Sequence, residues 1–347
     1  MKKIEFKPML VSIILVLLIY YFYTPALNIH AIEFWIFLIV AICIYGVASS
    51  YSTLLGKKFK PEKVGYLGAA VAVIVAGILV TDLFTSKIFH ASRYASRIEV
   101  ENVKFNNKTL HEVDFSKTPI IDRKSTVKLG DKVMGEIPEY VSQFEVSDDY
   151  TQISYKNSVY RVTPLEYASF FKYLTNSKNG IPAYITVNST NGKTDIVKLK
   201  DLGLDGMKYV PSAILNQNLN RKLQLSYPTS IFGSPSFEVN EKGHPWYVCT
   251  TYTYFGVGNK KKVTGAVLFD PITGKSKKYD KGKVPKWVDR VYPEELIMTE
   301  IDENGSLQDG FFNSVLGQKN VTVTSEGYNY LEKDGDIWIY SGITSAN

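Results

Sequence analysis

Met9 to Ala26 reads MLVSIILVLLIYYFYTPA, an apolar stretch without a charged residue. Two more apolar stretches follow: Ile32 to Ser49 (IEFWIFLIVAICIYGVAS), with Glu33 near its start, and Tyr66 to Phe84, with Asp82 near its end. A helix that crosses the hydrocarbon core of a bilayer needs about 20 mostly apolar residues, at about 1.5 Å each. The sequence therefore predicts three transmembrane helices, over about 9–26, 32–49 and 66–84.

The charged residues are distributed unevenly along the 347 positions. Positions 1–84 contain only 7 of the 40 basic residues and 4 of the 34 acidic residues. This separation excludes a simple cytosolic enzyme and a disordered chain, and the small basic excess speaks against nucleic-acid binding. We expect a transmembrane domain over 1–84, followed by two α+β modules over 85–205 and 206–347.

Lysines predict the orientation of the three spans. They lie before the first span and after the second, at Lys2, Lys3, Lys7, Lys57, Lys58, Lys60 and Lys63. Because cytoplasmic loops carry the excess of basic residues, we expect a cytoplasmic N-terminus and residues from about 85 onward outside the cell membrane. A cleaved signal peptide is the alternative for the first segment, whose apolar stretch is longer than the hydrophobic region of a usual signal peptide.

The third predicted span is rich in small residues, at Gly68, Ala69, Ala72, Ala76 and Gly77. Small side chains let two helix backbones approach closely within a bilayer. We therefore expect this face of the span to pack against another helix.

Residues 85–347 change to short alternating runs with frequent turn residues, which predicts an α+β region with much strand. The expected strands are 97–105, 140–146, 151–155, 158–162, 183–188, 193–199, 237–240, 246–254, 263–269, 277–279, 328–332 and 337–343. Residues 285–300 fit a short helix or a strand.

Two helices are expected among these strands. The first is expected to begin at Pro164, because Thr163 offers a capping hydroxyl and proline suits the first helical position. Its apolar face would contain Tyr167, Ala168, Phe171 and Leu174. The second helix is expected over about 212–225.

Two of the expected hairpin turns echo each other, 82 residues apart. The segment 187–193 (VNSTNGK) and the segment 269–275 (FDPITGK) both end a strand, place a short polar side chain next, and continue to Gly and Lys. Turn chemistry alone favours Asn, Asp and Gly at such positions, so chance remains the alternative to two related helix-plus-hairpin modules.

The run 267–275 (VLFDPITGK) resembles the terminal hairpin of PepSY-type domains. The resemblance covers about 212–280, with 164–199 as a degenerate second copy. It implies small α+β modules outside a bacterial membrane that bind or restrain a partner, and it carries over no catalytic residues.

The sequence points to no catalytic residue, cofactor site or metal site. The four histidines, His30, His90, His111 and His244, lack metal-ligand spacing, and Cys43 and Cys249 are too far apart in the expected layout for a disulfide. Cys249 follows His244 by five residues, which places the two side chains on opposite faces of a strand. We expect Cys249 to be a buried structural residue.

A lysine-rich stretch is the main candidate for surface contact. It includes Lys260, Lys261, Lys262, Lys275, Lys277 and Lys278. Such a surface suits an anionic partner, such as lipid headgroups or a wall polymer. The alternative is a solvated edge, where lysines prevent sheets from associating.

Three functions remain open from the sequence. The first is a non-enzymatic, membrane-anchored envelope protein whose exported modules bind a protein or an anionic polymer. The second is an envelope-acting enzyme, for which carboxylates converging near Asp289, Arg290 or Glu294 would be the sign. The third is a subunit of a membrane complex that assembles through the small-residue face of the third span.

Overall fold

The computed structural model describes residues 6–54, 61–104, 106, 118–156, 158–333 and 336–345. Its chain forms two compact units. The helical unit combines Met1–Phe89 with Leu223–Ile231 and Tyr252–Lys262, and the sheet unit combines His90–Lys222, Phe232–Thr251 and Val263–Asn347. The expected boundaries at 84/85 and 205/206 stay a prediction.

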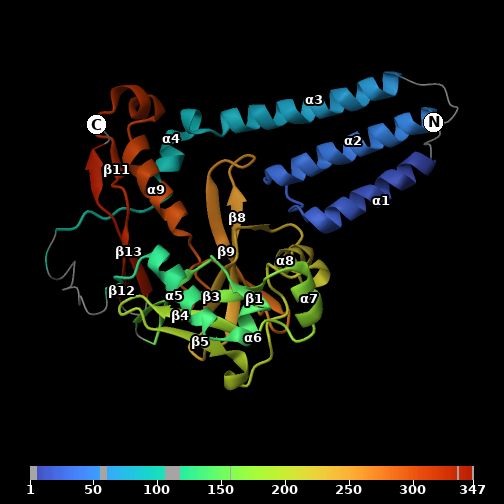
Figure 1. Ribbon diagram of the computed structural model, residues 1–347. Helices are drawn as coiled ribbons and strands as arrows, with labels where there is room; N and C mark the ends of the chain where they lie inside the picture. Colours follow the sequence, from blue (N-terminus) through green and yellow to red (C-terminus); the bar gives the residue numbers. More distant parts are fainter. Residues whose placement is uncertain are drawn as a thin grey trace. The chain divides into compact units, whose positions relative to one another are not determined.

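Three long helices open the chain, α1 (Phe6–Tyr23), α2 (Ile32–Leu54) and α3 (Pro61–Phe84), and α2 contacts both of the others (Figure 1). Two segments, Ile32–Ser50 and Val64–Phe84, are long and apolar enough to cross a membrane. Met9–Tyr23 in α1 is a shorter apolar helix. The described region thus contains two helices that meet the length and composition of a membrane span.

The first sheet contains five antiparallel strands. They are β1 (Phe144–Val146), β2 (Thr151–Tyr155), β3 (Ser158–Tyr167), β4 (Ala183–Asn188) and β5 (Thr194–Lys198). β3 pairs with β2 along its first half and with β1 along its last three residues, while β4 lies on its other side and β5 forms the far edge. The strand predictions at 151–155, 183–188 and 193–199 are confirmed.

The second sheet has the same strand order as the first. Its strands are β6 (Ile231–Phe232), β7 (Ser236–Val239), β8 (Pro245–Tyr254), β9 (Lys261–Phe269) and β10 (Ser276–Asp280). Both β6 and β7 pair with the ten-residue β8, as β1 and β2 pair with the ten-residue β3, and β10 forms the edge as β5 does. The chain therefore contains two copies of one five-strand arrangement.

The turns of the two terminal hairpins match in detail. Asn188 Oδ1 accepts hydrogen bonds from the N–H groups of Thr190 and Asn191, and Asp270 Oδ1 accepts from those of Ile272 and Thr273. In each turn the glycine four residues later donates to the backbone oxygen of the Asn or Asp, at 2.8 and 2.9 Å, and adopts a positive φ. The sequence echo thus corresponds to one turn geometry used twice, a position that favours glycine.

The prediction of a helix that begins at Pro164 is wrong, because β3 continues through Tyr167. On one side of β3, β2 pairs up to Val162 and β1 pairs from Leu165, so Pro164 lies opposite neither β1 nor β2. The missing N–H of the proline therefore costs no hydrogen bond to these two strands. The helix of this region is α7 (Phe170–Asn176), whose N-cap Ser169 accepts a hydrogen bond from Lys172 N.

Three other expectations need correction. Residues 97–104 form no strand, and Arg97 at their start forms ion pairs with Glu300 and Glu303 instead. The second helix is shorter than expected, since a 3₁₀ turn at Leu215–Gln217 precedes α8 (Leu219–Ser226). The run 337–343 is two strands, β13 (Asp336–Tyr340), which pairs with β12 (Asn329–Lys333), and β14 (Ile343–Ser345), which pairs with β11 (Thr322–Thr324). The turn expected at 334–335 lies outside the described residues.

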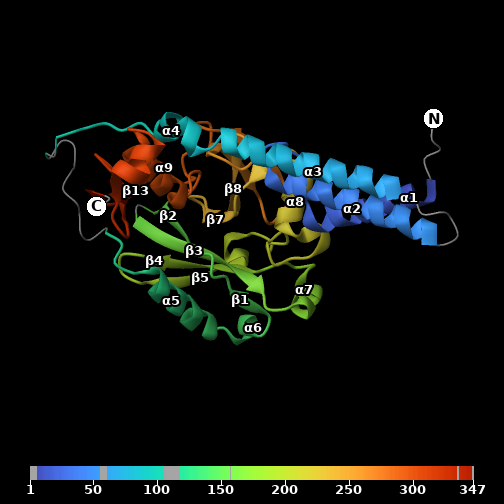
Figure 2. The same cartoon turned by 90° about the horizontal axis from the view of Figure 1, so that it is seen from above.

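The remaining helices lie around the two sheets. They are α4 (Lys87–Ala95), α5 (Arg123–Gly135), α6 (Pro138–Val141) and α9 (Glu294–Leu307). Residues 285–293, which fitted a helix or a strand, belong to neither, and α9 begins where they end. Helix α4 is kinked at His90, and within the sheet unit its second part lies beside α9 (Figures 1 and 2).

The two sheets share one core. The ring of Tyr184 on β4 lies 5.7 Å from the ring of Phe237 on β7, and Tyr184 Oη donates a hydrogen bond to Gly243 O at 2.8 Å. Both side chains are almost completely buried. The repeated arrangements are therefore packed together in one unit.

Candidate functional site

The predicted lysine-rich stretch falls into two places. Lys260, Lys261 and Lys262 belong to the tip of the β8–β9 hairpin, which forms part of the helical unit. Lys275, Lys277 and Lys278 lie at β10, the outer strand of the second sheet in the sheet unit. The lysines of the sequence run are therefore divided between the two units.

The β10 edge carries the denser group of charges. Six exposed lysines follow one another within twelve residues, with Asp280 the one acid among them: Lys275, Lys277, Lys278, Lys281, Lys283 and Lys286. Two of their ammonium groups lie over aromatic rings, Lys277 over Tyr279 and Lys281 over Tyr292, each at 4.9 Å. Such contacts hold the aliphatic stems along the surface while the charged ends face water. We call this set the β10 lysine edge.

The corresponding edge of the first sheet differs in its charge balance. Lys193, before β5, lies 3.5 Å from Asp195, and Lys198 lies 4.0 Å from Glu139. Each of these lysines has an acidic partner from β5 or α6. The repeat therefore provides two edges of the same strand order, of which only the β10 edge has a large excess of positive charge.

The tip of the β8–β9 hairpin is fastened to the helices of its own unit. His30 Nδ1 lies 2.8 Å from Gly256 O, and Gly258 N donates to His30 O at 3.1 Å. Asn259 Nδ2 donates to Asp82 O and to Thr85 Oγ1 at the end of α3. Gly256 needs its positive φ and its missing side chain here, because a Cβ would lie against Thr85 Oγ1. One hairpin thus clamps the α1–α2 connection and the end of α3.

The small residues of α3 do not pack against α2. Gly68, Ala69, Ala72, Ala76 and Gly77 are all exposed. A Cβ placed at Gly68 or Gly77 would have no neighbouring atom within 4 Å. Within the described chain, the expected packing face therefore has no partner helix, and its role in assembly stays a prediction.

Carboxylates do converge near Asp289 and Arg290. Glu238 on β7 is completely buried, and its two oxygens accept hydrogen bonds from the N–H groups of Asp289 and Arg290, each at 3.0 Å. Asp289 Oδ2 accepts from Ser154 N on β2 at 2.8 Å, and Glu294 lies 3.5 Å from Arg290. Burial, and then the neighbouring Asp289 carboxylate, raise the pKa of Glu238 to about 8.

The hydrogen bonds of this network join separate segments of the fold. Both oxygens of Glu238 are occupied by backbone donors, and the Asp289 carboxylate holds β2. A general acid or base must reach a substrate proton within hydrogen-bond distance. The arrangement fixes the 288–290 loop between β2 of the first sheet and β7 of the second.

Cys249 is the buried structural residue that the sequence predicted. It is 0 % exposed, and burial raises the pKa of its thiol, which keeps it protonated and unreactive. Across the ranges that the structure describes, no three His, Cys, Asp or Glu side chains gather as metal ligands. His111 lies outside those ranges.

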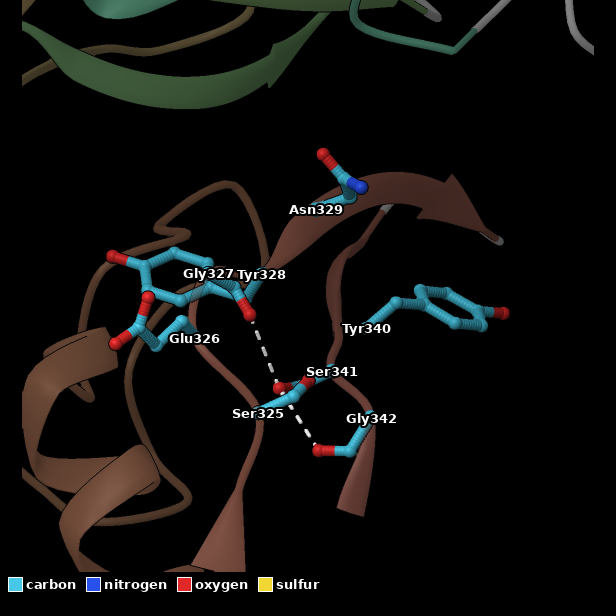
Figure 3. Close-up of a pocket in the computed structure, with 8 residues that line it drawn as sticks. All are labelled: Ser325, Glu326, Gly327, Tyr328, Asn329, Tyr340, Ser341 and Gly342. Carbon is cyan, nitrogen blue, oxygen red and sulfur yellow. Dashed lines mark hydrogen bonds between the residues drawn. The ribbon is translucent and has the colours of Figure 1, made fainter. Parts of the chain in front are cut away.

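A shallow pocket of about 530 Å³ lies between residues 325–329 and 340–342 (Figure 3). Tyr328 and Tyr340 line it, but their rings point in opposite directions and so do not form two facing walls. The Ser341 hydroxyl donates to Gly327 O at 3.2 Å. The pocket is therefore a depression between two linked backbone segments, without a stacking platform or a charged pair directed into it.

No protein-family model, curated protein or solved structure matches the chain. Its candidate site therefore rests on the residues themselves. Sequence reasoning found the β10 lysines from their density, but it missed the hairpin clamp and the Glu238 network, since their partners are 50 to 230 residues away in the sequence.

Proposed function

We propose that the chain is a membrane-anchored envelope protein whose exported, PepSY-like sheets bind an anionic polymer. In this proposal α1, α2 and α3 all span the membrane, the N-terminus is cytoplasmic, and residues from about 85 onward are extracytoplasmic. The lengths of α2 and α3 and the lysines that flank them support the anchor. The β10 lysine edge is the observation that carries the binding function.

The density of charge at β10 favours a polymer with repeated negative groups. A run of lysines with one acid among them attracts such a chain along its length, because each ammonium group meets a new negative group. Protection of a sheet edge from aggregation is the competing explanation for edge lysines. The two explanations can be separated at β5. This strand is also a sheet edge that needs protection from aggregation, but its lysines are paired with acidic residues.

The experiment compares these two edges in the full chain. The protein is placed in nanodiscs of zwitterionic lipid, and its binding to a poly(glycerol phosphate) chain is measured at several salt concentrations. The triple variant Lys275→Gln, Lys277→Gln and Lys278→Gln removes three charges from the β10 edge. The matched control, Lys193→Gln, Lys198→Gln and Lys200→Gln, removes three charges at β5 and from the 3₁₀ turn (Leu199–Leu202) that follows it.

We expect the β10 variant to bind on the order of 100-fold more weakly, since each lysine near an anionic surface contributes about 1 kcal/mol. We also expect the salt dependence of binding to become shallower in this variant. The β5 variant should bind as the parent does. Equal weakening by both variants, or none by either, would show that the β10 lysines do not form a specific binding surface.

A further inference from the structure

The chain makes a tight apolar turn directly after α9. Phe312 leads into a π-helical turn, Asn313–Gly317. We call residues 312–316, which include the three exposed apolar side chains of this region, the 312–316 turn. Phe312 is 65 % exposed, Val315 56 % and Leu316 79 %. Each such side chain would gain about 1.5–3 kcal/mol from complete burial. Three of them together in one short turn mark a surface that meets another apolar phase.

The 312–316 turn is held in shape by its own hydrogen bonds. Asn313 Oδ1 accepts from Lys319 N at 3.2 Å, and Asn313 Nδ2 donates to Lys319 O at 2.9 Å. Gln318 N donates to Asn313 O at 2.6 Å, and Gln318 adopts a left-handed conformation with φ of 47°. Both polar atoms of the Asn313 side chain therefore bond to the backbone of Lys319, and these bonds fix the backbone that carries the three apolar side chains.

The base of this turn is packed against α4. Phe311 contacts the cluster of Tyr94, Ala95 and Leu307, which also includes Ala91. Asn304 Nδ2 donates to Ala95 O at 2.9 Å, which ties α9 to the same helix. The 312–316 turn is therefore fixed to α4.

Helix α4 starts close to the end of an apolar span. α3 ends at Phe84 and α4 begins at Lys87. Helix α4 is kinked at His90, so the chain length alone sets the limit: Ala91 follows Phe84 by seven residues, which extend at most about 25 Å. Ala91, which belongs to the cluster at the base of the turn, therefore lies within about 25 Å of the end of α3.

The beginning of α4 has the composition of a helix at a membrane surface. Ile88 and Phe89 are exposed, and the ring of Phe89 stacks on that of Phe84 at 5.5 Å. Lys87 and Arg93 are exposed on the same short helix. Exposed apolar side chains beside basic residues are typical of helices that lie in the interface of a bilayer.

We propose that Phe312, Val315 and Leu316 insert into the headgroup region and upper acyl chains of the bilayer that contains α3. This inference rests on the membrane anchor of the proposed function. The bilayer is the occupant that the chain itself brings within reach, through α4, and the exposed Lys319 beside the turn suits lipid phosphates. Insertion would give the sheet unit a second attachment to the membrane.

The test uses environment-sensitive labels on single cysteines of the full chain in nanodiscs. Cys43→Ser removes the exposed thiol, and the buried Cys249 does not react. An NBD fluorophore is attached at Leu316→Cys, at Val73→Cys on the exposed face of α3, or at Leu202→Cys, an exposed position in the 3₁₀ turn after β5. Nitroxide lipids then quench the label at shallow or deep positions.

We expect the label at position 316 to emit at shorter wavelength and to be quenched by the shallow nitroxide lipid. The label at 73 should be quenched by the deep nitroxide, and the label at 202 by neither. If 73 is quenched but 316 behaves like 202, the insertion is overturned and the anchor stands. A blue-shifted but unquenched label at 316 would assign the turn to a protein partner and also overturn it. If 73 is not quenched, both proposals fall.

Discussion

Replacing Arg97 by methionine is expected to lower the free energy of unfolding of the sheet unit by about 3–5 kcal/mol. Arg97 Nη2 lies 2.9 Å from Glu300 Oε1, and Arg97 Nη1 lies 2.7 Å from Glu303 Oε2. The three side chains are 6 %, 11 % and 6 % exposed. Methionine fills much of the volume but leaves two buried carboxylates without their counterion, and this is the costly step.

The loss should depend on pH in a defined direction. Burial already raises the pKa of Glu300 with Arg97 in place. Arg97 lowers the pKa of Glu300, so without the guanidinium the folded-state pKa of Glu300 rises further above its unfolded value, and the variant loses stability as pH increases. We therefore expect a larger difference between variant and parent at pH 8 than at pH 5.

Urea unfolding of the full chain, followed by tryptophan fluorescence in detergent, measures this difference. Arg93→Met on the exposed side of α4 is the matched control and should change the unfolding free energy by less than about 0.5 kcal/mol. If Arg97→Met unfolds at the same urea concentration as Arg93→Met, the ion cluster does not hold α9 to the segment that follows α4.

The second large effect concerns Glu238, whose pKa burial raises to about 8. A carboxyl group whose folded-state pKa lies above its unfolded value binds more protons in the folded state. Glu238 therefore stabilises the folded state when the pH is below its unfolded-state pKa, and this stabilisation is lost as pH rises toward 8. We expect the stability of the sheet unit to fall between about pH 5 and pH 8 because of this group.

Glu238→Gln should flatten that dependence, because the amide does not titrate. It should also cost about 1–3 kcal/mol at pH 5, since its NH₂ group faces a backbone N–H that the carboxyl oxygen accepted. Urea unfolding at pH 5, 6, 7 and 8 gives both quantities, with the exposed Glu241→Gln as control. An unchanged slope in Glu238→Gln would mean that this residue is ionised throughout the range.

Local chemistry explains which parts of the fold the sequence could predict. The hairpin turns at 188–193 and 270–275 were predictable because Asn, Asp and Gly satisfy the turn by themselves. The long apolar helices were predictable for the same reason, since length and composition alone identify them. Each of these features needs no information from distant residues.

Pro164 shows where such reasoning fails. Its dipeptide with Thr163 has the chemistry of a helix start, yet the residue fills the break between β2 and β1 along β3. Only the pairing of three strands determines this, and no local pattern reports it. Ser169, the actual cap, is followed by two phenylalanines and carries neither the proline nor the glutamate that usually mark a helix start.

The candidate site follows the same division. The density of lysines at β10 is visible in the sequence, but the contrast with the acid-balanced β5 edge requires the repeated strand order. Arg97 was placed in an expected strand, because its two acidic partners are more than 200 residues away. Long-range ion pairs of this kind need the three-dimensional fold.

Membrane topology tests the central claim most directly. In cells that express the full chain with Cys43→Ser, a membrane-impermeant maleimide is applied before and after permeabilisation to two variants, Leu202→Cys and Lys58→Cys. We expect Leu202→Cys to be labelled in intact cells and Lys58→Cys only after permeabilisation. Labelling of Leu202→Cys only after permeabilisation would contradict an exported sheet unit, and recovery of the chain in the soluble fraction without detergent would contradict the membrane anchor itself.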